Sequence, residues 1–174
     1  MYDIFGEGKM VILGIDPGLA IVGWGVLECV KGKFHVLGYG CIKTEAHTPV
    51  EERIEQIYDS MNTIIEKYKP QVMAVEELFW NTNQKTGITV AEARGTILLA
   101  AHKHGLKIHE YTPLQVKQAV VGYGRAEKNQ VITMVTSILK LPKPPKPDDT
   151  ADALAIAICH GHAGESPLGK FYTM

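Results

Sequence analysis

Two short apolar runs, each ending in a carboxylate, constrain this chain more than any other feature of its sequence. Residues 11–16 (VILGID) end at Asp16, just before a Pro-Gly pair, and residues 71–76 (QVMAVE) end at Glu76. Apolar runs of this length that are bounded by turn residues are typical of buried β-strands. Folds that combine such strands with helices place their chemistry at strand ends and helix starts. Both acids are therefore candidates for a functional site.

The remaining pattern predicts an α/β fold. Further strands are expected at residues 21–30, 34–44 and 107–111, and helices at residues 49–69, 90–104, 113–121, 126–141 and 148–162. Thr48 is the expected N-cap of the first helix, with Glu51 completing a capping box, and residues 79–87 have the composition of a loop. This order of elements predicts a mixed five-stranded sheet flanked by helices, in which the first three strands are antiparallel.

Length and composition predict a single folded domain. The chain has 174 residues, of which 45% are hydrophobic, and this is enough to bury one core. We expect the domain to span residues 10–163, between an N-terminal extension at residues 1–9 and a flexible tail at residues 164–174. No apolar run approaches the roughly 20 residues that cross a bilayer, and the cysteines show no spacing typical of a disulfide framework or a zinc site. These features predict a cytoplasmic protein with no membrane partner.

The charge distribution is uneven, although the net charge is only -1. Residues 101–147 contain eight lysines and arginines against two acids, whereas residues 45–77 contain eight acids against three basic residues. A near-neutral total therefore does not exclude a positive face that binds nucleic-acid phosphates. The alternative is that these lysines only form a solvated surface.

Acids on three predicted elements fit a site for hard divalent cations. Asp149 and Asp152 lie in the first turn of the last helix, whereas Asp16 and Glu76 end two strands. Mg²⁺ prefers oxygen ligands, and two such ions about 4 Å apart can activate water and stabilise the leaving oxygen of a phosphodiester. Taken singly, each acid has another explanation, as a turn former, a solvated strand end or a helix cap. Their joint occurrence favours metal binding.

Six segments resemble the RuvC-type Holliday-junction resolvases in order and in spacing. They are GIDPG at residues 14–18, AVEELF at 74–79, AEARG at 91–95, QVKQAVVG at 115–122, AEK at 126–128 and DTADALA at 149–155. The first segment alone is not specific, because actin-like sugar kinases open similarly, but the set is. The resemblance extends from about residue 11 to residue 162 and implies a ribonuclease-H-like fold.

The resemblance implies a metal-dependent endonuclease that nicks four-way DNA junctions in symmetric pairs. The implied metal-binding catalytic acids are Asp16, Glu76, Asp149 and Asp152, and the implied DNA contacts are Lys117, Lys128 and Phe79, to which Arg125 of the same basic stretch is added. The lysines would contact backbone phosphates, and the aromatic ring would insert at the crossover. We expect two Mg²⁺ ions per active site, for which Mn²⁺ substitutes. The implied partners are four-way junction DNA, a second copy of the chain in a homodimer, and a RuvA–RuvB branch-migration complex.

The residues leave other functions open. An actin-like ATPase or sugar kinase needs a second half-domain to close over its nucleotide, and 174 residues leave no space for one. A catalytically inactive junction-binding module is expected to lack one of the acids, and all of them are present. A ribonuclease-H-like nuclease that acts on structured RNA is the nearest alternative, which substrate preference would separate. Phe79 and its neighbour Trp80 also have an alternative role as ordinary core residues.

Overall fold

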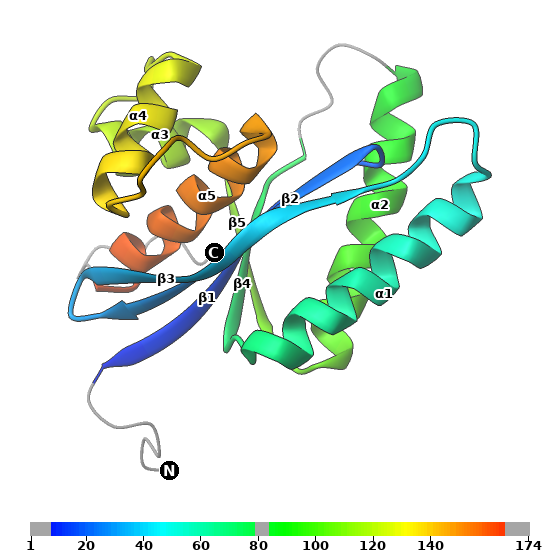
Figure 1. Cartoon of the computed structure of the whole chain (residues 1–174), viewed down its shortest axis with the longest axis horizontal. Helices are drawn as coiled ribbons and strands as arrows, with labels where there is room; N and C mark the ends of the chain where they lie inside the picture. Colours follow the sequence, from blue (N-terminus) through cyan, green and yellow to red (C-terminus); the bar gives the residue numbers. More distant parts are fainter. Residues whose placement is uncertain (1–7, 79–83, 166–174) are drawn as a thin grey trace.

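A five-stranded mixed sheet forms the centre of the protein in the computed structural model, which describes residues 8–78 and 84–165 (Figure 1). The strands are β1 (Lys9–Asp16), β2 (Ile21–Val30), β3 (Lys33–Lys43), β4 (Val72–Glu76) and β5 (Lys107–Tyr111). Their order across the sheet is β3-β2-β1-β4-β5. The β1–β2 and β2–β3 pairs are antiparallel, whereas β1–β4 and β4–β5 are parallel. The predicted mixed sheet with an antiparallel first half is confirmed.

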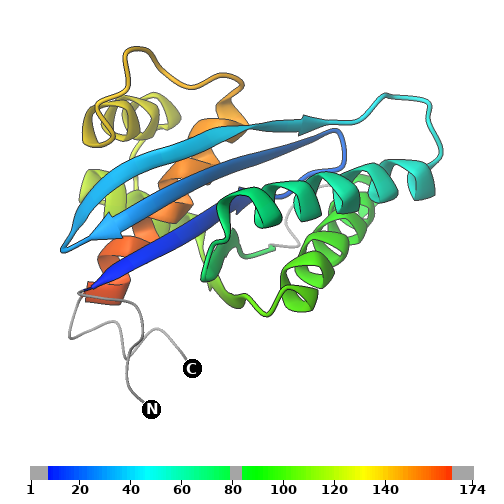
Figure 2. The same ribbon diagram turned by 60° about the horizontal axis from the view of Figure 1, so that its bottom comes forward.

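Helices cover both faces of this sheet (Figures 1 and 2). On one face lie α1 (Val50–Tyr68) and α2 (Gln84–Lys103), and on the other lie α3 (Pro113–Val121), α4 (Lys128–Ile138) and α5 (Asp148–Glu165). Each face has its own cluster of buried apolar side chains. None of the helices in the described part of the chain is long and apolar enough to cross a membrane.

The alternation of side chains along the strands decides which face receives the two strand-end acids. In β1, Ile12 belongs to the apolar cluster under α5, and in β4 so does Ala74. Because side chains of a strand alternate between the faces with a period of two, Asp16 and Glu76 point to the same face as Ile12 and Ala74. Both acids therefore face the layer formed by α3, α4 and α5.

Two element boundaries differ from the predicted ones. Residues 84–87 form the first turn of α2, although residues 79–87 were predicted to be a loop. Polar composition by itself does not distinguish a loop from the first turn of a helix. The fourth helix is shorter than the predicted 126–141, because Glu127 forms a capping box with Gln130 and Lys140 adopts a left-handed φ of 52°.

The ends of the first and last helices also differ from the prediction. Pro49, and not Thr48, occupies the N-cap position of α1, where no side chain accepts a capping hydrogen bond. The last helix continues to Glu165 instead of ending at residue 162, and the first strand begins at Lys9. The regular elements thus extend slightly beyond residues 10–163 at both ends.

Gly14 in β1 permits an unusually close approach of α5 to the sheet. A Cβ atom placed on Gly14 would lie 2.1 Å from the carbonyl oxygen of Ala153 and 2.8 Å from the Cβ of Ala157. The first of these contacts is with backbone, which cannot move aside without shifting the helix. The position of α5 over β1 therefore depends on the absence of a side chain at this point.

We predict that Gly14→Ala lowers the free energy of unfolding by about 2 kcal/mol or more, as expected for overpacking a close-packed core. Gly87→Ala is the matched control, since a Cβ at Gly87 in α2 meets nothing within 4 Å. This control should leave stability unchanged or raise it by up to roughly 1 kcal/mol, because alanine is the better helix former. Urea unfolding of both variants decides the matter. Equal stabilities would contradict the close packing.

Candidate active site

The parallel pairing of β1 with β4 brings Asp16 and Glu76 side by side. Ile15 is paired with Val75 across these strands, and each acid follows its paired residue directly. On the other side of β1, Asp16 is the register partner of Gly23 in β2. The two acids thus end adjacent strands at one edge of the sheet and point toward α5.

The first turn of α5 adds further acids to this edge. Burial is the main cause that raises the pKa of Asp16 to about 8. Negative charges on neighbouring residues add to the shift, in decreasing order from Glu76, Asp152 and Asp149. Since charges act on a pKa only at short range, the structure brings together all four of the predicted acids. Asp16 is the member whose ionisation is opposed most.

Two other members of this group also have raised pKa values. Burial, followed by the charge of Asp152, raises the pKa of Glu76, and the lysines Lys128 and Lys117 only partly oppose this. Burial likewise raises the pKa of Asp152, against the hydrogen bond and the positive charge of Lys128. The positive charges of this chain are therefore too few to return the pKa values of these acids to their ordinary range.

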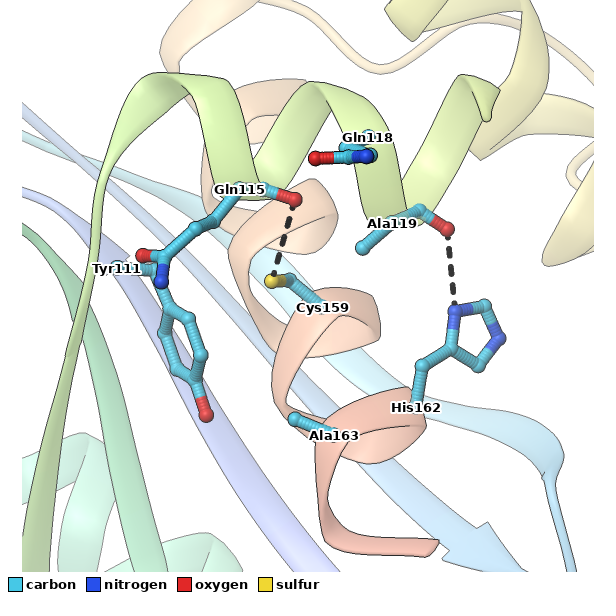
Figure 3. Close-up of a pocket in the computed structure, with 7 residues that line it drawn as sticks. All are labelled: Tyr111, Gln115, Gln118, Ala119, Cys159, His162 and Ala163. Carbon is cyan, nitrogen blue, oxygen red and sulfur yellow. Dashed lines mark hydrogen bonds between the residues drawn. The ribbon is translucent and has the colours of Figure 1, made fainter. Parts of the chain in front are cut away.

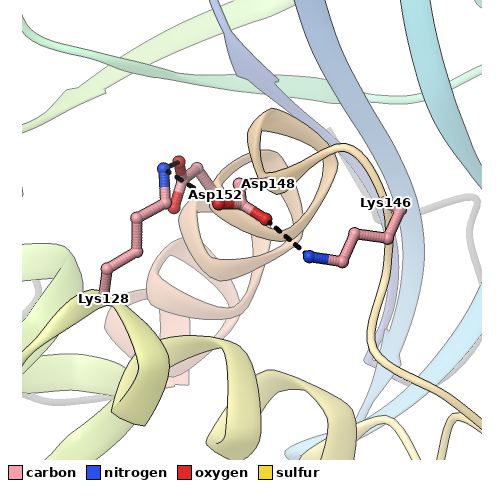
Figure 4. Close-up of polar contacts among 4 residues, drawn as sticks. All are labelled: Lys128, Lys146, Asp148 and Asp152. Atoms are coloured by element: carbon pink, nitrogen blue, oxygen red, sulfur yellow. Dashed lines mark hydrogen bonds and ion pairs between the residues drawn. The ribbon is translucent and has the colours of Figure 1, made fainter.

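Lys128, at the start of α4, lies among the acids (Figure 4). Its Nζ is 3.1 Å from a carboxylate oxygen of Asp152 and 3.9 Å from one of Asp148. Burial on its own lowers the pKa of Lys128, but the hydrogen bond and the charge of Asp152 outweigh it, so the pKa is raised. The lysine side chain is 54% exposed, so solvent weakens this pair and it can exchange partners.

Asp148 has the residue type of an N-cap, but it does not cap α5. The helix already includes Asp148, and the N–H of Thr150 donates to the carbonyl oxygen of Pro147. The carboxylate of Asp148 instead pairs with Lys146, at 3.3 Å, and with Lys128 (Figure 4). Because this carboxylate pairs with two lysines, it does not accept hydrogen bonds from the backbone N–H groups of the first turn of α5.

The donor set suits a hard divalent cation. Its members are all carboxylates, and oxygen ligands are what Mg²⁺ and Mn²⁺ take in proteins. Within residues 8–78 and 84–165, no three acidic, imidazole or thiol groups already converge as a metal-binding cluster. The raised pKa of Asp16 nevertheless indicates a deficit of positive charge that a cation would correct. The residues present fit such an ion.

A cavity of about 200 Å³ opens beside the acids. It is lined by Glu76, Pro113, Val116, Lys117, Lys128, Val131, Asp152, Ala155 and Ile156. Two acids and two lysines thus line one recess. This combination suits a phosphodiester, because acids can hold a cation and lysines can bind phosphate oxygens. Arg125 is exposed between α3 and α4 and does not line this cavity. Phe79 lies outside the described residues.

The apolar floor of this cavity was not predicted. Val116 and Val131 belong to α3 and α4 and are buried, as the helical periodicity indicates. Periodicity predicts burial but not which residues border the acids, because that depends on how α3 and α4 pack on α5. No signal in the sequence would have identified these residues as part of the site.

A second cavity, of about 270 Å³, lies between α3 and α5 (Figure 3). It is lined by Tyr111, Gln115, Gln118, Ala119, Cys159, His162 and Ala163, none of them an acid. Burial raises the pKa of the Cys159 thiol to about 12, so this thiol stays protonated and is a poor nucleophile. The acid-lined cavity is therefore the better candidate for catalysis.

The sequence profile of the family described as "Crossover junction endodeoxyribonuclease RuvC" matches residues 12–160. The chain belongs to the RuvC family. The protein of that name from Clostridioides difficile (strain 630) is 55% identical over 156 residues, which cover 90% of this chain and 92% of the relative. The similarity therefore extends over nearly the whole of both sequences.

Solved RuvC structures share the fold. Thermus thermophilus RuvC has a TM-score of 0.83 and 38% identity, over 89% of this chain and 95% of that one. The same protein in complex with a Holliday junction substrate has a TM-score of 0.82 and 35% identity, with the same coverage. The yeast mitochondrial Holliday junction resolvase, at 16% identity and a TM-score of 0.64 over 89% of this chain and 80% of that one, supports the fold alone. The predicted ribonuclease-H-like fold is confirmed.

We predict that Asp16→Asn stabilises the metal-free protein at pH 8 but not at pH 4. The pKa of the Asp16 carboxyl group rises from 3.8 in the unfolded chain to about 8 in the folded one. Between these pH values the carboxyl group is protonated in the folded state and ionised in the unfolded state, so the free energy of unfolding falls as the pH rises. Asparagine removes this penalty, which is on the order of a few kcal/mol near neutral pH. Urea unfolding in EDTA at pH 4, 6 and 8 measures it.

The matched control is Asp59→Asn, an exposed carboxylate on α1, which should show no such pH-dependent gain. Added Mg²⁺ should stabilise the wild type more than Asp16→Asn, because a ligand that binds only the folded state raises its stability. A constant difference between Asp16→Asn and the wild type at all three pH values would refute the electrostatic account.

Proposed function

We propose that this chain is an endonuclease that resolves four-way DNA junctions by paired symmetric nicks in recombination and repair. The observation that carries the proposal is the gathering of Asp16, Glu76, Asp149 and Asp152 around Lys128, at the rim of a recess that also contains Lys117. Four acids from three elements are more than a structural cap needs. They are suited to holding cations against a phosphodiester.

The nucleases of this family depend on divalent metal ions, and we infer two Mg²⁺ ions per active site, for which Mn²⁺ substitutes. Asp16, Glu76, Asp149 and Asp152 would hold them. Bound ions would supply an activated water and stabilise the leaving oxygen of an in-line displacement. The acids orient this chemistry through their fixed places on β1, β4 and α5.

The basic residues would hold the DNA backbone. Lys117 and Lys128 line the same recess as Glu76 and Asp152, so a phosphate that reaches the acids also reaches both ammonium groups. Lys128 would then exchange its carboxylate partner for the phosphate. Arg125, which is exposed outside the recess, would contact a more distant phosphate, and Phe79 would insert at the crossover.

A homodimer would pair two such sites to match the two-fold symmetry of a junction. One face of α2 supports this arrangement. Ile88 and Leu99 are 56% and 53% exposed and lie on the same side of the helix as Gly95, where a Cβ would meet nothing within 4 Å. Exposed apolar residues beside a small one suit contact with a second helix. We further infer that the protein acts in the cytoplasm, with a RuvA–RuvB complex delivering the junction.

The test of the function compares substrates under one set of conditions. The purified chain is incubated with a synthetic four-way junction, a linear duplex of the same sequence and a structured RNA, with Mg²⁺ or with EDTA. We expect nicks at symmetric positions in the junction only, dependent on Mg²⁺, with ends that DNA ligase rejoins. Preferential cleavage of the RNA would instead favour the alternative of an RNA-processing nuclease.

Asp149 and Asp148 are neighbours in the chain, but their carboxylates interact with different groups. The charge of Asp149 raises the pKa of Asp16, whereas Asp148 is not among the groups that act on Asp16 and pairs with Lys146. We predict that Asp149→Asn lowers the single-turnover rate on a junction at least about tenfold, or roughly 1.4 kcal/mol in the barrier.

Asp148→Asn is the matched control, since it makes the same chemical change one residue away. It should change the rate by less than about threefold, because its exposed ion pairs contribute little. If Asp148→Asn proved the more damaging variant, the assignment of the acids on α5 would be wrong.

A further inference from the structure

Thr150 lies between Asp149 and Asp152 in the first turn of α5, and its side chain points into the protein. It is fully buried, with 0% of its surface exposed. Its hydroxyl group donates a hydrogen bond of 3.1 Å to the carbonyl oxygen of Gly40 in β3. The helix start is thus attached to a strand 110 residues earlier in the chain by a side chain that cannot itself reach solvent.

The first turn of α5 also packs closely against β2, the strand next to β3. A Cβ atom on Gly23 in β2 would lie 2.0 Å from the carbonyl oxygen of Asp149 and 3.0 Å from the backbone nitrogen of Thr150. Gly23 is also the register partner of Asp16 in β1. The backbone that carries Asp149 therefore rests on the residue directly opposite Asp16.

These two contacts act in different ways on the start of α5. The Gly23 contact is steric, so it limits how closely the helix approaches but does not hold it there. The hydrogen bond of the Thr150 hydroxyl is attractive and directional, so it adds to the apolar packing of α5 a contact that fixes where its first turn lies relative to β3.

We propose that Thr150 is a positioning residue, whose hydrogen bond to Gly40 holds Asp149 and Asp152 at the distance from Asp16 at which they bind a divalent cation together. The inference rests on the proposed metal site. Ligand groups must be held within roughly 0.5 Å of their working geometry, and a buried hydrogen bond on the same turn as two ligands is suited to this. Thr150 touches neither the cation nor the DNA.

The test measures Mn²⁺ binding to the full chain by calorimetry, together with the melting temperature in EDTA. Thr150→Val keeps the shape of the side chain and removes the hydroxyl, whereas Thr150→Ser keeps the hydroxyl. We expect Thr150→Val to weaken Mn²⁺ binding at least about fivefold and Thr150→Ser to stay within about twofold of the wild type. In cleavage assays, Thr150→Val should raise the Mn²⁺ concentration for half-maximal rate more than it lowers the rate at saturation.

Ile158→Val is the stability control, because Ile158 is fully buried in the same helix but two turns beyond the acids. It should lower the melting temperature without weakening Mn²⁺ binding. Wild-type affinity in Thr150→Val, or an equal loss in Ile158→Val, would overturn the positioning role. If Thr150→Val does not fold, Thr150→Ala replaces it, since alanine also lacks the hydroxyl and places no methyl group against Gly40.

Failure of the metal site is distinguishable from failure of this role. If the wild type binds no Mn²⁺, or binds it as tightly as Asp16→Asn does, the assignment of the carboxylates as metal ligands is wrong. The positioning role of Thr150 is then wrong as well. If the wild type binds Mn²⁺, Asp16→Asn does not, and Thr150→Val binds like the wild type, only the positioning role is wrong.

Discussion

The close contact between α5 and the backbone of the sheet is the constraint on which the rest of this structure depends. Gly14 in β1 and Gly23 in β2 leave no side chain between the strands and the helix, and carbonyl oxygens of α5 occupy that space. The helix is also almost entirely apolar where it is buried. Its first turn is therefore held directly over the strand ends. The distance between the acids of β1 and α5 therefore depends on this close packing of the backbone.

This packing concentrates negative charge in a partly buried place, which works against folding. Burial and the neighbouring acids oppose the ionisation of Asp16, and the positive charge of Lys128 offsets this only in part. The ion pair of Lys128 with Asp152 is exposed enough to exchange its partner. We propose that a cation completes this site, and local strain of this sort is tolerated where function needs it. The RuvC-family chain thus gives up stability at the edge of the sheet where we place its active site.

Most of the fold could be predicted because its signals are local. Strands such as β1 and β4 are continuous apolar runs, and the helices show a regular apolar period. The errors arose where one local pattern is compatible with more than one structure. Asp148 has the residue type of an N-cap, but its carboxylate pairs with Lys128 of α4 and with Lys146, two residues before it in the chain. The first turn of α2 has the composition of a loop, and polar composition by itself does not distinguish the two.

The sequence by itself determined which residue types are available to the site: four acids at strand ends and at a helix start, and lysines in a basic stretch. It also determined the faces of the strands, because side chains alternate regardless of what packs against them. Only the tertiary structure decided that β4 lies beside β1, that Gly23 and Thr150 meet at the start of α5, and that Lys128 enters the acid group while Arg125 does not. The physical reason is that these contacts join residues far apart in the chain. Their distances follow from the packing of whole helices and strands, which no local pattern encodes.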